Sequence, residues 1–481
     1  MNYGIKDKPK TIKEWILYTL QMVLSVFCAT VLISNICGTP VNSCLLGACL
    51  ATLIYEIITG FKSPMFMSSC GATVSAVIGA LALPSIAGQN YLMVAVGGII
   101  IAIVYAIFAA LYKTKGANFI NKLLPPSIVG AITIVIGLNL AKFLPTYTHN
   151  SNTWEVVVGI SVMFVIALTS HYFKGFLKTI PFLFGILFGY VFCLILKIFN
   201  VDIISFEAFK HMQWYPDFTF LKWHAEDFSW VNVGKTILLF LPVSLCAICE
   251  HISDHKVLGN IVEKDLISDP GLDKTLLGNG AASVLGTVVG GLPQTSYGEG
   301  ISTIGFSKVA SVYVTMMAAL FLGVLSFLAP VNAFIQTIPS CVFSGAAMVL
   351  YGYIAASGLK TLYNNKVDLE NNKNLTIVSV VLCVGISGMF LFTDAFAGVS
   401  LAMVLGIILN IILRDKDSKI KIEKDNNRET QTKIVTLTEE EYKEVLDNSI
   451  YCKSLIVRKI GIFCTVLLSI LLLSALIVLI F

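Results

Sequence analysis

Long apolar stretches separated by short polar loops run through almost the whole chain. About fifteen of them are long enough to cross a lipid bilayer, since a spanning helix needs about 20 apolar residues. The first fourteen fall within residues 14–413, and the last occupies residues 460–481. The pattern therefore predicts an all-α polytopic membrane protein.

The composition supports this class and excludes others. The chain has 481 residues, of which 56% are hydrophobic and 13% are charged, whereas a soluble domain carries about 25% charged residues. No basic run lies on a soluble domain, so we expect no nucleic-acid partner. The cysteines are scattered, mostly within apolar stretches, and indicate no metal site and no disulfide framework. We therefore expect no cofactor and no metal.

The loops predict the orientation. Lysines cluster in alternate loops, around residues 113–122, 256–274 and 360–373, and in the segment 414–459. The short loops of the other set, such as residues 85–91, contain no Lys or Arg. Positive residues mark the cytoplasmic side. We expect a multi-pass protein of the cytoplasmic membrane with a cytoplasmic N-terminus, and an aromatic-rich outer loop at residues 199–235.

Two pairs of segments resemble each other across the halves of the chain. Residues 64–71 and 293–300 each begin with Pro and reach Gly seven positions later, and residues 124–130 resemble residues 338–345. In the order of spans both pairs are offset by seven. Because seven is odd, the halves have opposite orientations, which predicts an inverted repeat with interrupted spans three and ten. The alternative is chance similarity between Gly- and Pro-rich membrane segments.

Glu299 is the strongest candidate for chemistry. A carboxylate at membrane depth costs roughly 2.5–3.5 kcal/mol on insertion scales, and this one lies in the Gly-broken stretch 293–302. We expect an extended segment through Tyr297 and Gly298, then a half-helix that begins near Gly300 and directs its N-terminal N–H groups at a polar cavity. The alternative is a carboxylate in a vestibule or one paired for folding.

The third span supplies the counterpart of this stretch. Ser69, Cys70 and Gly71 would precede a second half-helix, and two half-helices that meet at mid-membrane make a polar pocket of backbone groups. These three residues therefore join Tyr297, Gly298 and Gly300 as candidate solute-binding positions.

A second acidic group follows the apolar run 236–249. Glu250 and Asp254 are four residues apart and so lie on one face of a helix. Two carboxyls this close can load and release a proton, as cotransport requires. Asp254 and the neighbouring His255 can instead be simple helix-end polarity, and His251 a packing or capping residue. Glu250, Glu299 and Asp254 are the candidate proton-coupling residues.

These motifs resemble the nucleobase–ascorbate transporter family, in particular its bacterial uracil/xanthine permease branch. The similarity is carried by residues 250–256, 260–266, 269–272, 292–308 and 350–359 and covers residues 14–413. The run Thr-Ser-Tyr-Gly-Glu at residues 295–299 is specific to that family. Two positions depart from the family pattern, because Gly300 stands where Asn is usual and Gly71 where uracil permeases often carry an aromatic residue.

The resemblance implies a 7+7 inverted-repeat fold with a core domain, a gate domain, and short strands in spans 3 and 10. Glu250 and Glu299 would contact the solute between those strands. The implied organisation is a cytoplasmic N-terminus (1–13), a first core-domain segment (14–112), a first gate-domain segment (113–198), an extracellular loop (199–235), a second core-domain segment (236–330), a second gate-domain segment (331–413), a cytoplasmic segment (414–459) and an additional span (460–481).

The function that follows is a transporter and not an enzyme. We expect a proton-coupled symporter that imports a nucleobase by alternating access, uracil first and otherwise xanthine or another purine. Its partners would be the solute, protons, the lipid bilayer and a second copy bound through the gate domain. The alternatives are an anion transporter of the same fold, and a membrane receptor or scaffold that acts through residues 414–459.

Overall fold

The apolar runs form helices in the computed structural model, which describes residues 1–86, 88–116, 125–141, 153–210, 212, 218–391 and 393–413. These residues belong to one unit, Met1–Arg414. The expected cytoplasmic segment 414–459 and additional span 460–481 lie outside the described residues.

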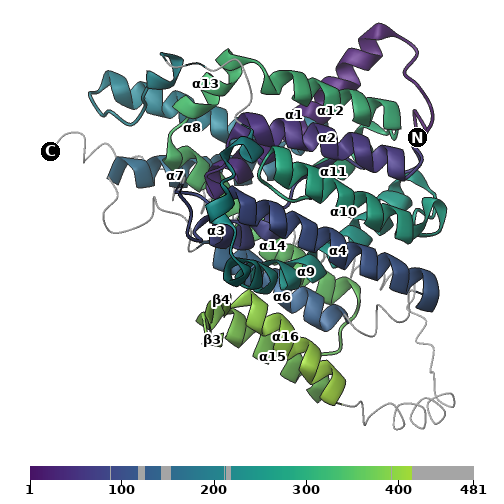
Figure 1. Cartoon of the computed structure of the whole chain (residues 1–481). Helices are drawn as coiled ribbons and strands as arrows, with labels where there is room; N and C mark the ends of the chain where they lie inside the picture. The colour runs from purple at the N-terminus through teal and green to yellow at the C-terminus, as the bar shows by residue number, and fades with distance from the viewer. Residues whose placement is uncertain are drawn as a thin grey trace, which may run out of the picture. The chain divides into compact units, whose positions relative to one another are not determined.

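In the described residues the first half carries one short strand, β1, among helices that are labelled in Figure 1. Its elements are α1 (Ile12–Cys37), α2 (Val41–Ile58), β1 (Met67–Ser69), α3 (Val74–Leu81), α4 (Tyr91–Lys115), α6 (Pro126–Leu140), α7 (Thr153–Tyr172) and α8 (Pro181–Ile198).

The second half begins after the loop 199–235, whose described residues include three short 3₁₀ turns. Its elements are α9 (Trp230–Val262), α10 (Leu272–Val289), β2 (Gln294–Ser296), α11 (Gly298–Ser307), α12 (Val312–Ser326), α13 (Ala329–Thr337), α14 (Ser340–Asn364), α15 (Asn372–Ser387), β3 (Phe390–Leu391), β4 (Thr393–Ala397) and α16 (Val399–Ile412).

Local sequence explains where the first span begins and ends. Thr11 precedes α1 and its hydroxyl accepts from the backbone N–H of Glu14, while the Glu14 carboxylate accepts from the Thr11 N–H at 2.9 Å. This reciprocal capping box satisfies donors that a helix end leaves free. The helix stops at Gly38, whose φ of +68° suits glycine and ends the regular backbone.

Two spans are interrupted, as the sequence predicts. The helices α3 and α11 have 8 and 10 residues, which is about 12–15 Å at 1.5 Å per residue, half the apolar thickness of a bilayer. Each is preceded by a three-residue strand. The half-helix in the second repeat begins at Gly298, two residues earlier than expected.

The packing of the helices repeats between the two halves. The fourth span α4 packs on the ninth, α10, and the eleventh, α12, packs in the same way on the second, α2. Likewise α7 of the first half packs on α14 of the second, and α15 of the second half packs on α6 of the first. The inverted 7+7 repeat therefore organises the tertiary contacts (Figure 1).

Glycine allows the two repeats to meet closely between α6 and α14. A Cβ added to Gly358 would lie 2.6 Å from the Gly130 carbonyl oxygen, and one added to Gly130 would lie 2.9 Å from the Gly358 oxygen. Small residues of this kind let membrane helices approach backbone to backbone. The sequence echo at residues 124–130 thus includes a residue of the contact between repeats.

Two elements differ from the predicted spans. The eighth span was expected at residues 236–255, but α9 extends over 33 residues, Trp230–Val262. Glu250 and Asp254 therefore lie well inside the helix. The twelfth span was expected from residue 335, but a separate helix, α13, precedes α14 and makes an 80° bend with α12.

Candidate functional site

The two interrupted spans meet through their strands. Strand β1 pairs antiparallel with β2, so that Met67 lies opposite Ser296 and Ser69 opposite Gln294. The Cys70 N–H extends the pairing by donating to the Pro293 carbonyl oxygen at 2.9 Å. The pairing satisfies extended backbone inside the membrane and places the following half-helices at opposite ends of one short ribbon.

Both half-helices begin without a side-chain cap. The 3₁₀ turn that leads into α3 starts at Gly71 after Cys70, and α11 starts at Gly298 after Tyr297; no side chain of these two N-cap residues accepts from the helix. Their first N–H groups are therefore left for water or a ligand. Glu299 lies in the first turn of α11, where the positive end of the helix dipole favours an anion.

Helix α9 brings two further carboxylates, Glu250 and Asp254, to the strands. The Ser296 hydroxyl donates to Asp254 Oδ2 at 2.6 Å, which ties α9 to the end of β2. Glu250, one turn away, is close enough to Glu299 for their charges to interact. The three carboxyls that the sequence singles out as proton-coupling candidates thus come from two elements and gather at the strand pair.

The candidate positions differ in exposure. The side chain of Glu250 is exposed although it lies inside a long apolar helix, Gly298 is exposed, and Glu299 and Gly71 are half-buried. These four positions are the accessible members of the candidate set. The last of the predicted carboxyls, Asp254, is half-buried against Ser296.

The other four candidates are covered. Ser69 and Cys70 are buried in and beside β1, and the ring of Tyr297 is buried in an apolar cluster that includes Met22 and Val26. In this conformation Tyr297 offers its backbone to the site rather than its ring.

Gly300 faces the same apolar cluster. A Cβ at this position would lie 3.2 Å from Phe66 Cβ and 3.6 Å from Met22 Sδ. A side chain at residue 300 would therefore start towards apolar groups behind the site. The glycine, which stands where the family usually carries Asn, permits close packing there.

A buried histidine pair occupies another face of α9. His255 Nε2 lies 2.7 Å from the Tyr55 hydroxyl and 3.4 Å from Ser63 Oγ, while His255 Nδ1 lies 2.8 Å from the His251 carbonyl oxygen. The carbonyl can only accept, so Nδ1 carries the proton and Nε2 accepts from a hydroxyl. The Tyr55 hydroxyl, which also lies 3.0 Å from Ser63 Oγ, is the nearer of the two. Helix-end polarity is therefore the wrong interpretation of His255, which is fully buried inside α9.

No signal in the sequence identifies Tyr55 as a polar partner. Tyr55 and His255 are 200 positions apart, and neither lies in a motif that predicts the other.

Nearby on α2, Glu56 is also fully buried, and neither carboxyl oxygen has a hydrogen-bond partner in the described residues.

One surface ion pair joins the two repeats on the Lys-rich side. Lys62, after α2, donates to Asp269 Oδ1 at 2.6 Å, just before α10. The hydrogen bond and charge of Lys62 hold the pKa of Asp269 below its usual range.

In the described part of the chain, no three His, Cys, Asp or Glu side chains are grouped so that they could hold a metal ion.

Comparison with known proteins assigns the chain to a protein family. Residues 13–393 match the sequence model described as Permease family, which covers nucleobase–ascorbate transporters. The chain is 33% identical over 429 residues to a uracil permease of Bacillus subtilis (strain 168), covering 86% of this chain and 95% of that protein. It is also 33% identical over 421 residues to the uracil permease of Escherichia coli (strain K12), covering 85% and 94%.

Solved structures share the fold at low sequence identity. The transmembrane domain of a cyanobacterium bicarbonate transporter, BicA, superposes with a TM-score of 0.60 at 14% identity, covering 84% of this chain and 99% of that one. The murine anion transporter Slc26a9 in its inward-facing state gives a TM-score of 0.62 at 10% identity, covering 87% and 69%. Both comparisons establish the 7+7 inverted-repeat architecture.

Proposed function

Because this chain belongs to the nucleobase–ascorbate transporter family, we propose that it is a proton-coupled symporter that imports a nucleobase, uracil first. Relatives named uracil permease, which match most of the chain, support the solute class. Xanthine or another purine is the alternative solute.

One observation carries the proposal: Glu250, an accessible carboxylate on α9, is close enough for charge interaction to Glu299 in the first turn of α11. A uracil ring offers two N–H donors and two carbonyl acceptors. Carboxylates accept from the N–H groups, and the uncapped N-termini of α3 and α11 can donate to the carbonyl oxygens. Neither Gly71 nor Gly298 places a side chain in the way, and a Cβ at Gly298 would meet no atom within 4 Å.

Proton coupling follows from the grouping of like charges. Glu250 and Asp254 are one turn apart on α9, and Glu299 is near both. Three negative charges so close repel each other, and one proton relieves that repulsion. A proton taken from the outside would stabilise the loaded site, and its release to the cytoplasm would weaken solute binding.

Movement would occur between the core domain (14–112 and 236–330) and the gate domain (113–198 and 331–413). The strand pair and all three carboxyls belong to the core domain, so the site would travel as one body while α6 and α14 of the gate remain in place. The N-terminus would be cytoplasmic, and two copies would associate through gate domains in the cytoplasmic membrane.

The driving force is sufficient. One proton crossing about 100 mV yields about 2.3 kcal/mol, and one pH unit adds about 1.4 kcal/mol. The sum supports roughly a 500-fold gradient of a neutral solute carried with one proton.

Uptake of radiolabelled uracil into proteoliposomes tests the proposal. An inward pH gradient should drive accumulation by the wild type, and Glu250→Gln or Glu299→Gln should abolish it. Glu263→Gln is the matched control, since Glu263 is an exposed carboxylate just beyond the end of α9. Accumulation by both site variants equal to wild type would refute the assignment of these residues.

Transport of an inorganic anion is the second candidate, suggested by the fold that the chain shares with anion carriers. Half-helix N-termini attract anions, but Glu250, Asp254 and Glu299 would repel them. Sulfate or bicarbonate uptake that excess uracil leaves unchanged would favour this candidate over nucleobase import.

A further inference from the structure

The N-terminal residues 2–7 pair with the linker between α11 and α12, beside which the N-terminus lies in Figure 1. Backbone hydrogen bonds join the two segments: the Asn2 N–H to the Lys308 oxygen at 2.7 Å, the Ala310 N–H to the Tyr3 oxygen at 2.9 Å, and the Val312 N–H to the Ile5 oxygen at 3.0 Å. The Ser311 hydroxyl also donates to the Asp7 carbonyl oxygen at 2.5 Å. Residues 2–7, the N-terminal clip, therefore contact the whole linker from the end of α11 to the start of α12.

Two buried side chains anchor the N-terminal clip. Ile5 is 5% exposed and belongs to the apolar cluster behind the candidate site that includes Tyr297 and Ile304. Tyr3 is 8% exposed, and its hydroxyl donates to Glu14 Oε2 at 3.1 Å, in the first turn of α1. The clip thus joins the start of α1 to the end of the half-helix α11.

The half-helix α11 lies between elements of the two proposed domains. On the core side, Thr303 Oγ1 lies 2.6 Å from Ser25 Oγ on α1 and 2.9 Å from the Glu299 carbonyl oxygen. On the gate side, α11 packs on the turn that follows α7, where a Cβ added to Gly175 would lie 3.4 Å from Phe306 Cζ. The clip is therefore one of the contacts that decide which domain α11 follows.

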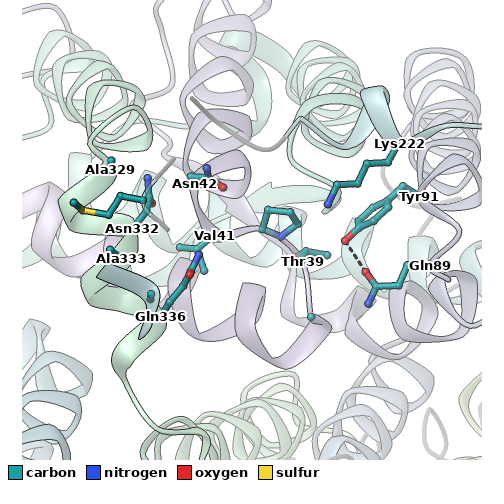
Figure 2. A pocket seen from close by; sticks show the side chains of 14 residues that line it. Thr39, Val41, Asn42, Gln89, Tyr91, Lys222, Ala329, Asn332, Ala333 and Gln336 are labelled. Atoms are coloured by element: carbon teal, nitrogen blue, oxygen red, sulfur yellow. Dashed lines mark hydrogen bonds between the residues drawn. The ribbon is translucent and has the colours of Figure 1, made fainter. Parts of the chain in front are cut away.

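The corresponding linker of the first repeat, between α3 and α4, is also held by a segment from elsewhere in the chain. Asp227 of the outer loop accepts from the Ile86 N–H at 2.9 Å, and the Asn90 side chain donates to the Asp227 carbonyl oxygen at 3.3 Å. Beside this contact the Tyr91 hydroxyl donates to Gln89 Oε1 at 2.6 Å, as Figure 2 shows. Both half-helices thus end in a linker that a distant segment fixes, and for α11 that segment is the clip.

A helix as short as α11 depends on such contacts. It has 10 residues, and isolated helices shorter than about 12–15 residues are marginal. Its first turn carries Glu299 and has no side-chain cap. In the proposed movement the core leaves the gate, so the contact between Phe306 and the turn at Gly175 breaks. The contacts of the clip would remain, because residues 2–7 continue directly into α1.

We propose that the N-terminal clip is a positioning element for transport. It keeps α11 with the core domain and so holds the Glu299 carboxylate where it binds the solute. Tyr3 and Ile5 act through α11 and its linker, and they do not touch the solute. This inference rests on the proposed function, and it adds a requirement for a segment outside the two repeats.

Deletion of residues 2–7 tests the inference directly. Lys8, Lys10 and Lys13 remain to set the orientation of α1. The dissociation constant of radiolabelled uracil, measured on purified protein, should rise about tenfold, the factor expected when one hydrogen bond to a charged group is lost. Backbone amides of α11 should exchange their hydrogens faster, whereas those of α3 should be unchanged.

Ile5→Ser tests the buried anchor without shortening the chain. It should raise the uracil dissociation constant in the same direction as the deletion, and the conservative variant Ile5→Val should restore wild-type binding. Lys6→Ser is the matched control, because Lys6 is the next residue and its side chain is exposed. The control should leave both uracil binding and the exchange of α11 unchanged.

Val312→Pro tests the backbone pairing. Val312 is the first residue of α12, where proline is well tolerated, and Ser311 before it is extended, with φ −69° and ψ 120°. The change removes the N–H that donates to Ile5, so it should speed exchange in α11 and weaken uracil binding. Asn372→Pro, at the first position of α15, is the control and should change neither. These point variants keep the test decisive if the deletion does not fold.

Two results would overturn the inference and leave the proposed function intact. One is an unchanged uracil dissociation constant in Ile5→Ser and Val312→Pro, even with a lower thermal midpoint, because that combination marks a purely structural segment. The other is exchange that rises equally in α3 and α11, which marks general destabilisation. Wild-type protein that binds no uracil would refute the proposed function and, with it, the assigned effect on solute binding.

Discussion

Replacing Gly286 with alanine should disturb the candidate site through one methyl group. Gly286 lies on α10, where a Cβ would be 2.4 Å from Gln294 Cγ and 2.6 Å from the Leu292 carbonyl oxygen. An ordinary contact is at least 3.4 Å, so β2 or α10 must move by about 1 Å. Nearby, the Ser283 hydroxyl holds β2 by donating to the Gln294 carbonyl oxygen at 2.7 Å.

The magnitude follows from three contributions. Overpacking of a close contact costs about 1–3 kcal/mol, and weakening the Ser283 bond adds about 0.6 kcal/mol, the average for such bonds in a membrane protein. Alanine regains about 1 kcal/mol of helix propensity. The net change is a loss of about 0.6–2.6 kcal/mol, and uracil uptake should fall because the displaced strand carries Ser296 away from Asp254.

The assay pairs thermal unfolding in detergent with proteoliposome uptake. Gly352→Ala on α14 is the matched control, since this mid-helix glycine is exposed and a Cβ there meets no atom within 4 Å. The control should be as stable as wild type or slightly more stable. If Gly286→Ala matched the control in both stability and uptake, the reasoning from close packing at β2 would be wrong.

Three further predictions concern other contacts. Tyr55→Phe should lower the free energy of unfolding by about 1 kcal/mol, because His255 Nε2 loses its donor at 2.7 Å; an unchanged thermal midpoint would contradict this. Asp269→Asn should remove the stability that the ion pair with Lys62 contributes. That contribution is present above the usual carboxyl pKa and is lost as pH falls through the lowered Asp269 pKa. The thermal midpoints of wild type and variant should therefore converge in acid, and also in high salt, which screens the pair. Gly300→Asn should lower the thermal midpoint without improving the KM for uracil, since the new side chain starts 3.2 Å from Phe66 Cβ; a lower KM would show that residue 300 reaches the solute.

Much of the fold could be predicted from local sequence. Continuous apolar runs specify spanning helices because lipid offers no partner to an exposed peptide group. Pro and Gly at residues 64–71 and 293–300 weaken helix formation in the same place of each repeat. The spacing of Glu250 and Asp254 places them on one helix face whatever surrounds the helix.

Boundaries and partners were less predictable. The bend between α12 and α13 and the full length of α9 depend on the elements packed around them. The hydrogen bond between Tyr55 and His255 joins two helices that are distant in the sequence, and no local pattern in either helix predicts it.

The sequence by itself therefore determined the membrane class, the repeat and the identity of the acidic residues, because these depend on composition and on the helical period. Only the tertiary structure decided which of those residues are accessible. The pairing of β1 with β2 joins the two interrupted spans, and there Tyr297 and Gly300 lie against an apolar cluster, whereas Glu250 is exposed and Glu299 half-buried. The direction in which these side chains point depends on segments more than two hundred residues away in the sequence. Tertiary packing determines which of those segments pair.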